Sequence, residues 1–228
     1  MEIQGEGDNC KPRALLRIIV LLGLLIGIRL LIKQLGFLFL EKIAGYDTLL
    51  STISMLLLTL VVLLAAKKRK LALKVFPEGI LPASRNKKTV VTYASLSLAT
   101  ALLIGSSLLF ADDHLSLFFR WGLVLHSTVV TPIYEELLFR GYVWSSLKAS
   151  GWRDLPVCLI TMLLFGVWHL GYFDSVLLRV NDSSAAFIMF MKVLTGLRYG
   201  IITGLIRYKT KNTMAAILAH SAMNVLGR

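Results

Sequence analysis

Apolar residues in this chain gather into long blocks that are separated by charged residues, glycine and proline. In a soluble domain the apolar residues would instead recur at the period of a helix or a strand. A block of roughly 18 or more apolar residues is long enough to cross a bilayer as a helix. The pattern therefore predicts an all-α fold, a polytopic transmembrane helical bundle of about seven spans. The expected spans cover residues 14–32, 49–66, 89–111, 115–148, 155–172, 185–206 and 213–226.

Some of these blocks and links have features of their own. The block 115–148 is too long for one straight crossing and contains Pro132, which lacks an N–H donor and should kink or restart the helix. Arg29 lies near the end of the first block, where a long side chain can extend to the interface. Residues 71–88 predict a cytoplasmic loop with room for a short interfacial helix, and residues 174–184 predict a polar link.

The distribution of charge supports a membrane protein. The 228 residues are 56% hydrophobic and carry a formal net charge of +12. A basic excess can indicate nucleic-acid binding, but here Lys and Arg cluster at the ends of the apolar blocks, as in residues 67–70. Such clusters are typical of cytoplasmic loops facing anionic lipid, so the expected partner is the lipid bilayer and not nucleic acid. The alternation places the N-terminus and residues 67–88, 148–153 and 207–211 in the cytoplasm, and the C-terminus outside.

The first apolar block and the cysteines add two smaller inferences. No small-residue cleavage site follows the first block, so we expect an anchor that is retained rather than a signal peptide. The two cysteines, Cys10 and Cys158, provide neither a disulfide framework nor a metal-binding spacing.

Three ionisable side chains lie within six positions of the otherwise apolar fourth block: Glu135, Glu136 and Arg140. A charge near the bilayer centre costs about 2.5 to 3.5 kcal/mol on insertion scales, so such residues are rare and usually functional. Glu136 and Arg140 are four residues apart on one helical face, where they can form an ion pair. Because successive side chains on a helix rotate by about 100°, we expect Glu135 to point away from that pair and to be left free.

Polar residues interrupt two further apolar blocks. His169 follows Phe165 by four residues in the fifth block, and His220 precedes Asn224 by four residues in the last one. A single histidine in a helix is more often a satisfied interior residue than a catalyst. So many polar groups within spans, however, must satisfy one another or bind something. We therefore expect the fourth, fifth and seventh spans to meet around one polar cavity.

The side chains of that cavity can be given chemical roles. Glu135 is the expected general base on a water molecule, and His169 would hold this water or relay its proton. His220 and Asn224 would donate hydrogen bonds to a developing oxyanion. The ion pair of the neighbouring glutamate would fix the helix that presents Glu135. Such a set is suited to peptide hydrolysis without a covalent intermediate.

Other hydrolytic devices find less support in the sequence. No G-x-S-x-G elbow and no H-E-x-x-H motif is present. Neither cysteine lies near a histidine in sequence. A metal stays open, since Glu135, His169 and His220 would supply a His₂Glu set for Zn²⁺. We favour no bound metal and no cofactor.

The CAAX-protease and bacteriocin-processing (CPBP) family of intramembrane proteases has three motifs that this sequence resembles: Glu135-Glu136-x-x-x-Arg140, Phe165-x-x-x-His169 and His220-x-x-x-Asn224. The resemblance covers about residues 115–228, with the motifs in the family's order. It suggests N-terminal membrane spans in residues 1–112, with about three crossings, and a CAAX-protease-like catalytic membrane core in residues 113–228.

The resemblance implies an intramembrane endopeptidase with a multi-helix core around a cavity. Members of the family are described both as glutamate-dependent enzymes and as metalloproteases. Eukaryotic members cut prenylated C-termini. The compact length and the lack of organelle signals suggest instead a multi-pass protein of a bacterial cell membrane. Its substrate would be a membrane-embedded or membrane-associated peptide or protein.

Two other functions stay open. Some relatives are linked to bacteriocin self-immunity, so a non-catalytic immunity or scaffolding protein is the alternative. A small transporter that uses Glu135 and His169 as a proton relay is less favoured, because the sequence lacks two similar halves with broken helices.

Overall fold

The computed structural model describes residues 10–40, 45–76, 86–109, 117–178, 180 and 182–227. In these ranges the regular structure is helical throughout, so the expected all-α class is confirmed. The separate helices are α1 (Cys10–Leu40), α2 (Tyr46–Lys68), α3 (Lys87–Leu109), α7 (Asp154–Trp168), α8 (Phe173–Leu177), α9 (Asp182–Thr210) and α10 (Thr213–Leu226). One long interrupted helix joins α4 (Leu117–Leu125), α5 (Thr131–Glu136) and α6 (Trp144–Ala149).

Five helical stretches of the described chain are long and apolar enough to cross a membrane. They are Cys10–Leu40, Tyr46–Lys68, Lys87–Ser107, Asp154–Leu177 and Ser184–Thr210. The expected seven are therefore supported in part. The fourth block is divided into short helical segments, and the last helix, Thr213–Leu226, has only 14 residues. A multi-pass integral membrane protein follows from these lengths.

The interrupted helix contains two π-helical segments, one on each side of α5. The first is His126–Val130, where the Thr131 N–H bonds to the carbonyl of His126, five residues back. Pro132 follows at once in the first turn of α5, so the helix restarts there as expected. The second is Leu137–Val143, which leads into α6. Wider π-helical turns of this kind occur frequently at functional sites.

The links differ from the sequence prediction in two places. Residues 169–172 form a 3₁₀ turn after α7, and Phe173–Leu177 are helical, so the polar link predicted at 174–184 is partly helix. In the predicted loop 71–88, residues 71–76 are not helical, as expected, but Lys87 and Lys88 already belong to α3, and residues 77–85 lie outside the described residues.

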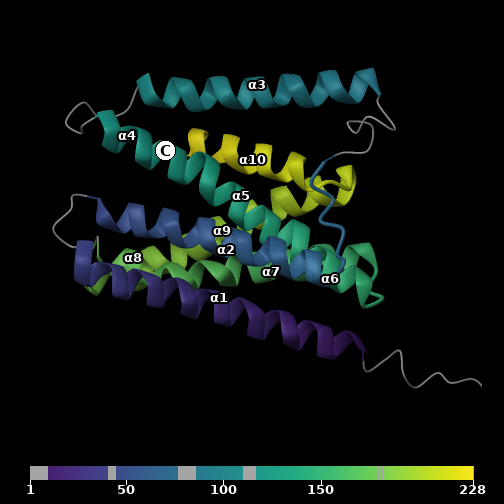
Figure 1. The fold of residues 1–228 in the computed structure, drawn as a ribbon, viewed down its shortest axis with the longest axis horizontal. Coiled ribbons are helices and arrows are strands. Elements are labelled where there is room, and N and C mark those ends of the chain that lie inside the picture. Colours follow the sequence, from purple (N-terminus) through teal and green to yellow (C-terminus); the bar gives the residue numbers. More distant parts are fainter. Residues whose placement is uncertain are drawn as a thin grey trace, which may run out of the picture.

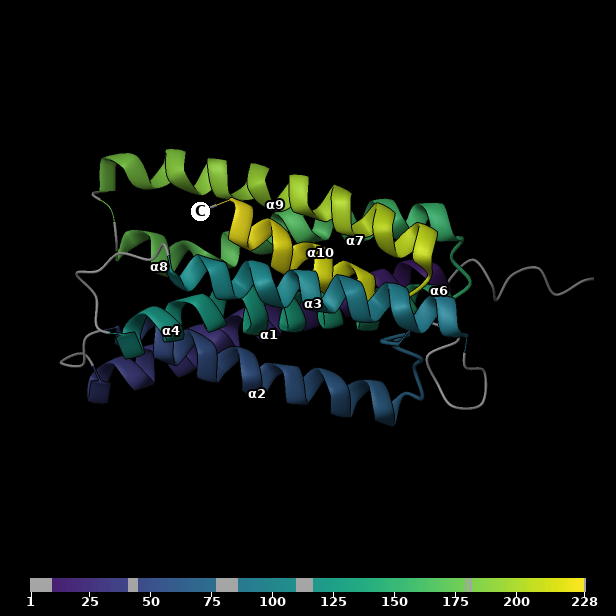
Figure 2. The ribbon, with the colours of Figure 1, turned by 90° about the horizontal axis from the view of Figure 1, so that it is seen from above.

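The helices form a bundle with α5 near its middle (Figure 1). α5 contacts α2 and α10, while α7 packs along α9. α3 covers α10 and α4 from the outside, and Thr100 is the one buried residue between residues 87 and 107. Viewed from above, α9 and α2 lie on opposite edges of the bundle (Figure 2). The buried aromatic core between them includes Tyr134, Phe139, Phe165 and Trp168.

Glycines bring α7 and α9 close together. A Cβ atom on Gly200 of α9 would lie 3.0 Å from the carbonyl oxygen of Met162 in α7. Gly196 and Gly204 lie one turn before and after Gly200, and both also face α7 or the turn that follows it. Small residues at this spacing allow backbones to approach in membrane proteins, where packing rather than hydrophobicity holds helices together.

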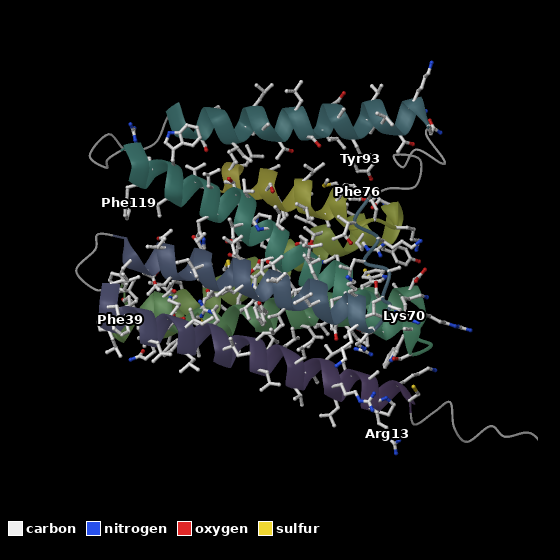
Figure 3. All side chains as sticks on the ribbon, viewed as in Figure 1. Arg13, Phe39, Lys70, Phe76, Tyr93 and Phe119 are labelled. Atoms are coloured by element: carbon white, nitrogen blue, oxygen red, sulfur yellow. The ribbon has the colours of Figure 1, made fainter. Side chains whose placement is uncertain are left out.

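Basic segments that are distant in sequence meet at one end of the bundle. The Thr213 N–H donates to the Lys74 carbonyl at 2.7 Å, and the Ser145 hydroxyl donates to the Ala72 carbonyl at 2.6 Å. Figure 3 shows Arg13 and Lys70 at this end, with Phe39 and Phe119 at the other. The predicted topology requires these basic segments to lie at the same end of the bundle. The side of the membrane that this end faces stays a prediction.

Candidate active site

A cavity of about 380 Å³ lies beside α5, and residues from eight helical segments line it, including the first π-helical segment and the 3₁₀ turn after α7. Four of the six predicted site residues are in its wall: Glu135, His169, His220 and Asn224. The fourth, fifth and last helical blocks thus meet as the sequence predicts. The other two residues, Glu136 and Arg140, are fully buried behind this wall.

Glu136 and Arg140 form the expected ion pair across one helical turn. The Arg140 Nε lies 3.3 Å from Glu136 Oε2, and neither side chain is accessible to solvent. The Arg140 Nη2 also donates to the Gly200 carbonyl at 2.9 Å, and the guanidinium lies 4.4 Å from the centre of the Phe165 ring. The pair therefore joins α5 to both α9 and α7, which gives it a structural role in the bundle.

Glu135 is bonded differently from its neighbour. The Tyr172 hydroxyl donates to Glu135 Oε1 at 2.5 Å, and His220 Nε2 lies 3.9 Å from Glu135 Oε2. The prediction that Glu135 is left free is therefore wrong in part. It stays apart from the Glu136–Arg140 pair, but a tyrosine from the turn after α7 holds one of its oxygens. The other oxygen faces the cavity wall formed by His220.

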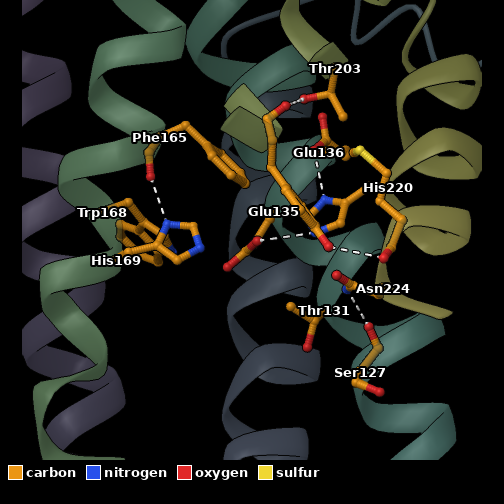
Figure 4. Close-up of polar contacts among 12 residues, drawn as sticks. Ser127, Thr131, Glu135, Glu136, Phe165, Trp168, His169, Thr203, His220 and Asn224 are labelled. Atoms are coloured by element: carbon orange, nitrogen blue, oxygen red, sulfur yellow. Dashed lines mark hydrogen bonds and ion pairs between the residues drawn. The ribbon is translucent and has the colours of Figure 1, made fainter. Parts of the chain in front are cut away.

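His169 faces the cavity with a defined tautomer. Its Nδ1 lies 2.8 Å from the Phe165 carbonyl, and because a carbonyl can only accept, Nδ1 carries a proton. In neutral His169 the lone pair is then on Nε2. In Figure 4, His169 and His220 approach Glu135 from opposite sides. The ring packs on Gly196, and only a residue without a side chain fits there, because a Cβ atom at this position would lie 2.5 Å from Nδ1.

His220 and Asn224 lie on one face of α10, as their spacing predicts, but they have partners that the sequence did not reveal. His220 Nδ1 donates to Glu136 Oε1 at 2.8 Å, so the Glu136 carboxylate lies between Arg140 and His220. The Asn224 amide donates to the Ser127 carbonyl at 2.6 Å, across the first π-helical segment. The other ring nitrogen of His220, Nε2, lies on the side of Glu135.

Tyr172 and Arg29 are site residues that sequence reasoning missed. Arg29 is 1% exposed, so the expectation that it extends to the interface is wrong. Its guanidinium pairs with Asp174 at 2.6 Å and lies 4.6 Å from the centre of the Tyr172 ring. Tyr172 follows His169 by three residues, which is a spacing that puts two side chains near one another. This spacing is the signal in the sequence that could have identified Tyr172 as a site residue. No neighbouring residue in the sequence indicates that Arg29 lies beside the site.

The first helix is anchored to this region by further charges. Lys33 of α1 lies 2.5 Å from Asp47 of α2 and 2.5 Å from Asp174 of α8. Since Asp47 also lines the cavity, the first two helices help to build the site.

The possible metal ligands do not converge. Among the residues that the structure describes, no three His, Cys, Asp or Glu side chains are arranged to hold a metal ion. His220 Nε2 lies 3.9 Å from Glu135 Oε2, and among the described residues no third ligand joins them in a metal-binding group. No step below passes through a metal.

Comparison with known proteins agrees with the motif resemblance. Residues 117–226 match the family described as type II CAAX prenyl endopeptidase Rce1-like. The chain is 26% identical over 106 residues to "CAAX prenyl protease 2" of Arabidopsis thaliana, a match that covers 46% of this chain and 34% of the plant protein. The chain thus matches only about a third of that relative's length. No solved structure matches it.

Residues 117–226 therefore form a domain of the Rce1-like type II CAAX prenyl endopeptidase family, and the expected family is confirmed. Both descriptions are those of proteases, and neither one mentions bacteriocin immunity. The matched range falls inside the expected core of residues 113–228, but the boundary at residue 112 stays a prediction.

Proposed function

We propose that this protein is an intramembrane endopeptidase that hydrolyses a peptide bond with an activated water. The observation that carries the proposal is the position of Glu135, which is buried in the wall of a polar cavity between two histidines from different helices. The family of the domain supports a protease, and an acid–base pair facing a cavity is the equipment such a reaction needs.

In the proposed reaction a water molecule sits between Glu135 and His169. Glu135 removes a proton from this water while the oxygen of the water adds to the carbonyl carbon of the substrate. The proton then passes to the leaving amine as the C–N bond breaks, and His169 Nε2 assists as donor or acceptor. Tyr172 holds Glu135 in place throughout, through the 2.5 Å hydrogen bond to Oε1.

His220 is the proposed donor to the oxyanion. To donate through Nε2 as well as through Nδ1, the His220 ring must carry a proton on both nitrogens. Its Nδ1–H is used by Glu136, which leaves the Nε2–H to stabilise the tetrahedral oxyanion. Asn224 contributes by fixing α10 against Ser127 and by lining the cavity.

The proposed substrate is a membrane-embedded or membrane-associated peptide or protein. The lining of the cavity extends to Thr48, Leu123 and Ser175, at the end of the bundle that carries α4 and α8. This end lies opposite to the basic end. If the basic end is cytoplasmic, the substrate enters from the other side of the membrane.

With Cys10 and Cys158 replaced by serine, a cysteine at Thr48 should react with an impermeant maleimide from outside. A cysteine at Lys68 should not, and the reverse pattern would contradict this topology.

The function itself is tested by cleavage in isotopically labelled water. Purified protein in lipid vesicles would be incubated with a pool of single-span peptides in H₂¹⁸O, and products would be identified by mass spectrometry. We expect new C-termini carrying ¹⁸O, and a rate about 10²- to 10⁴-fold lower for Glu135→Gln. Equal product from Glu135→Gln and the parent would contradict the role of Glu135 as the base, whereas no product from either protein would favour a non-catalytic scaffold.

A further inference from the structure

A second cavity lies at the basic end of the bundle, away from the proposed active site. It has a volume of about 410 Å³ and lies between the segment after α2, α6, the start of α7 and the end of α9. Five of the side chains that line it are cationic and one is acidic. The cations are Lys70, Lys74, Lys148, Arg207 and Lys211, and the acid is Asp154.

The one carboxylate of this cavity is already engaged twice. Asp154 pairs with Lys148 at 2.8 Å and with Lys211 at 2.9 Å. Counting five cations against one carboxylate leaves a charge of +4 around the cavity. Like charges held this close repel one another, and an anionic ligand would relieve the repulsion.

Arg207 is the most deeply placed of these cations. It is 3% exposed, and it has no carboxylate partner among the residues that the structure describes. Its Nε donates to the backbone carbonyl of Arg140 at 3.1 Å, and its guanidinium lies 5.2 Å from the centre of the Trp144 ring. The nearby carboxylate, Asp154, acts on Arg207 only from beyond ion-pair distance and is paired with two lysines, so an anion in the cavity would supply a closer counter-charge.

The surroundings of the cavity favour a lipid over a soluble ligand. α7 begins at Asp154 beside the cavity, and exposed Leu155, Leu159 and Leu163 follow at intervals of one turn. An apolar ridge that begins one residue after a charged pocket matches an amphiphile, whose headgroup binds the cations and whose chains lie along the helix. Basic pockets between helices at the end of a bundle bind anionic headgroups in other membrane proteins.

We propose that this cavity binds the phosphate headgroup of an anionic phospholipid. Arg207 and Lys70 are the headgroup ligands, with Lys148 at the rim. Through the Arg207–Arg140 contact the bound lipid would also steady the helix that carries the two glutamates. Binding is measured without any substrate, so its failure is distinguishable from failure of the proposed protease activity.

The test uses the full chain purified in an uncharged detergent. Short-chain phosphatidylglycerol, phosphatidylcholine with the same chains, and glycerol 3-phosphate would be titrated separately while the melting temperature is recorded. Lys70→Gln with Lys148→Gln removes two cavity cations. The matched control is Lys67→Gln with Lys68→Gln, which removes two exposed cations from the same end that do not line the cavity. Arg207 is left intact because its loss would disturb the fold.

We expect phosphatidylglycerol to raise the melting temperature, and phosphatidylcholine and glycerol 3-phosphate to leave it unchanged. The Lys70/Lys148 variant should bind phosphatidylglycerol about 30-fold more weakly, and the Lys67/Lys68 variant should bind like the parent. Equal weakening in both variants would show only general attraction to a basic surface and would overturn the site. An equal rise in melting temperature with glycerol 3-phosphate would overturn the proposal of a lipid ligand and assign the cavity to a soluble phosphate.

Discussion

Glu135 and Glu136 are adjacent in sequence, but their surroundings differ. Glu136 lies between Arg140 and His220, without access to solvent. Glu135 accepts one hydrogen bond from Tyr172 and faces a cavity that holds both histidines. One glutamate is enclosed by charged partners that come from the bundle itself, and the other is presented to a space in which a substrate can bind.

This difference arises from the rotation between successive residues on a helix. Because side chains at adjacent positions point about 100° apart, one residue can face the packed interior of the bundle while the next faces the cavity. The comparison teaches that a pair of acidic residues in a motif need not act as a pair. Glu136 belongs to the structure that holds α5, and Glu135 belongs to the proposed chemistry.

Arg140→Ala should have the largest effect on stability, because it removes the guanidinium and leaves the buried Glu136 carboxylate with His220 alone. Breaking a buried pair in this way typically costs about 3 to 5 kcal/mol. We expect poor accumulation and a melting temperature in detergent lower by at least several degrees. The double change Glu136→Gln with Arg140→Met removes both charges and should recover part of that loss. A variant Arg140→Ala that melts like the parent yet cleaves nothing would assign Arg140 to the chemistry instead.

Gly196→Ala should displace the His169 ring beside Glu135 and leave the Glu136–Arg140 ion pair unchanged. The new methyl group would lie 2.5 Å from His169 Nδ1, so the ring must move and its bond to the Phe165 carbonyl is lost. A displacement of about 1 Å in a reacting group can reduce the rate about 100-fold, and we expect a loss of that size in cleavage. Gly204→Ala is the matched control. There the methyl group would meet the flexible end of Met162, and activity should be retained. Equal loss in both variants would point to helix packing rather than to His169.

Tyr172→Phe should have the smallest effect of the three. The change removes the hydroxyl that holds Glu135 Oε1 but keeps the ring that lies beside Arg29. We expect about a tenfold decrease in cleavage, equivalent to about 1.4 kcal/mol, with little change in melting temperature. Tyr142→Phe removes a comparable hydroxyl, which accepts from Arg69 at 3.0 Å far along the bundle, and should leave cleavage unchanged. An unaltered rate in Tyr172→Phe would show that Glu135 needs no such support.

Much of the fold followed from local patterns in the sequence. The last helix spans Thr213–Leu226 as predicted, because the side chain of Asn212 caps it by accepting from the Ala215 N–H at 2.9 Å. Pro132 restarts the fourth block because its missing N–H cannot close an ordinary helical turn. The Glu136–Arg140 pair also follows from spacing alone.

What the sequence did not reveal depends on contacts between distant segments. His220 bonds Glu136 across 84 residues, and Arg29 contacts the Tyr172 region across more than 140. A spacing rule describes one helix and carries no information on which helices become neighbours. The buried position of Arg29 was missed for this reason, since its carboxylate partner lies on α8, beyond four intervening helical blocks.

The central claim, that Glu135 acts in the chemistry and Glu136 in the structure, is tested most directly by comparing Glu135→Gln with Glu136→Gln. Each change removes one negative charge and keeps the size of the side chain. Cleavage of the same membrane peptide and the melting temperature would be measured on equal amounts of folded protein. Our account predicts that Glu135→Gln melts like the parent and loses cleavage, while Glu136→Gln melts at a clearly lower temperature. If Glu135→Gln still cleaves, or if Glu136→Gln keeps the parent's melting temperature and loses only cleavage, the division of roles is wrong.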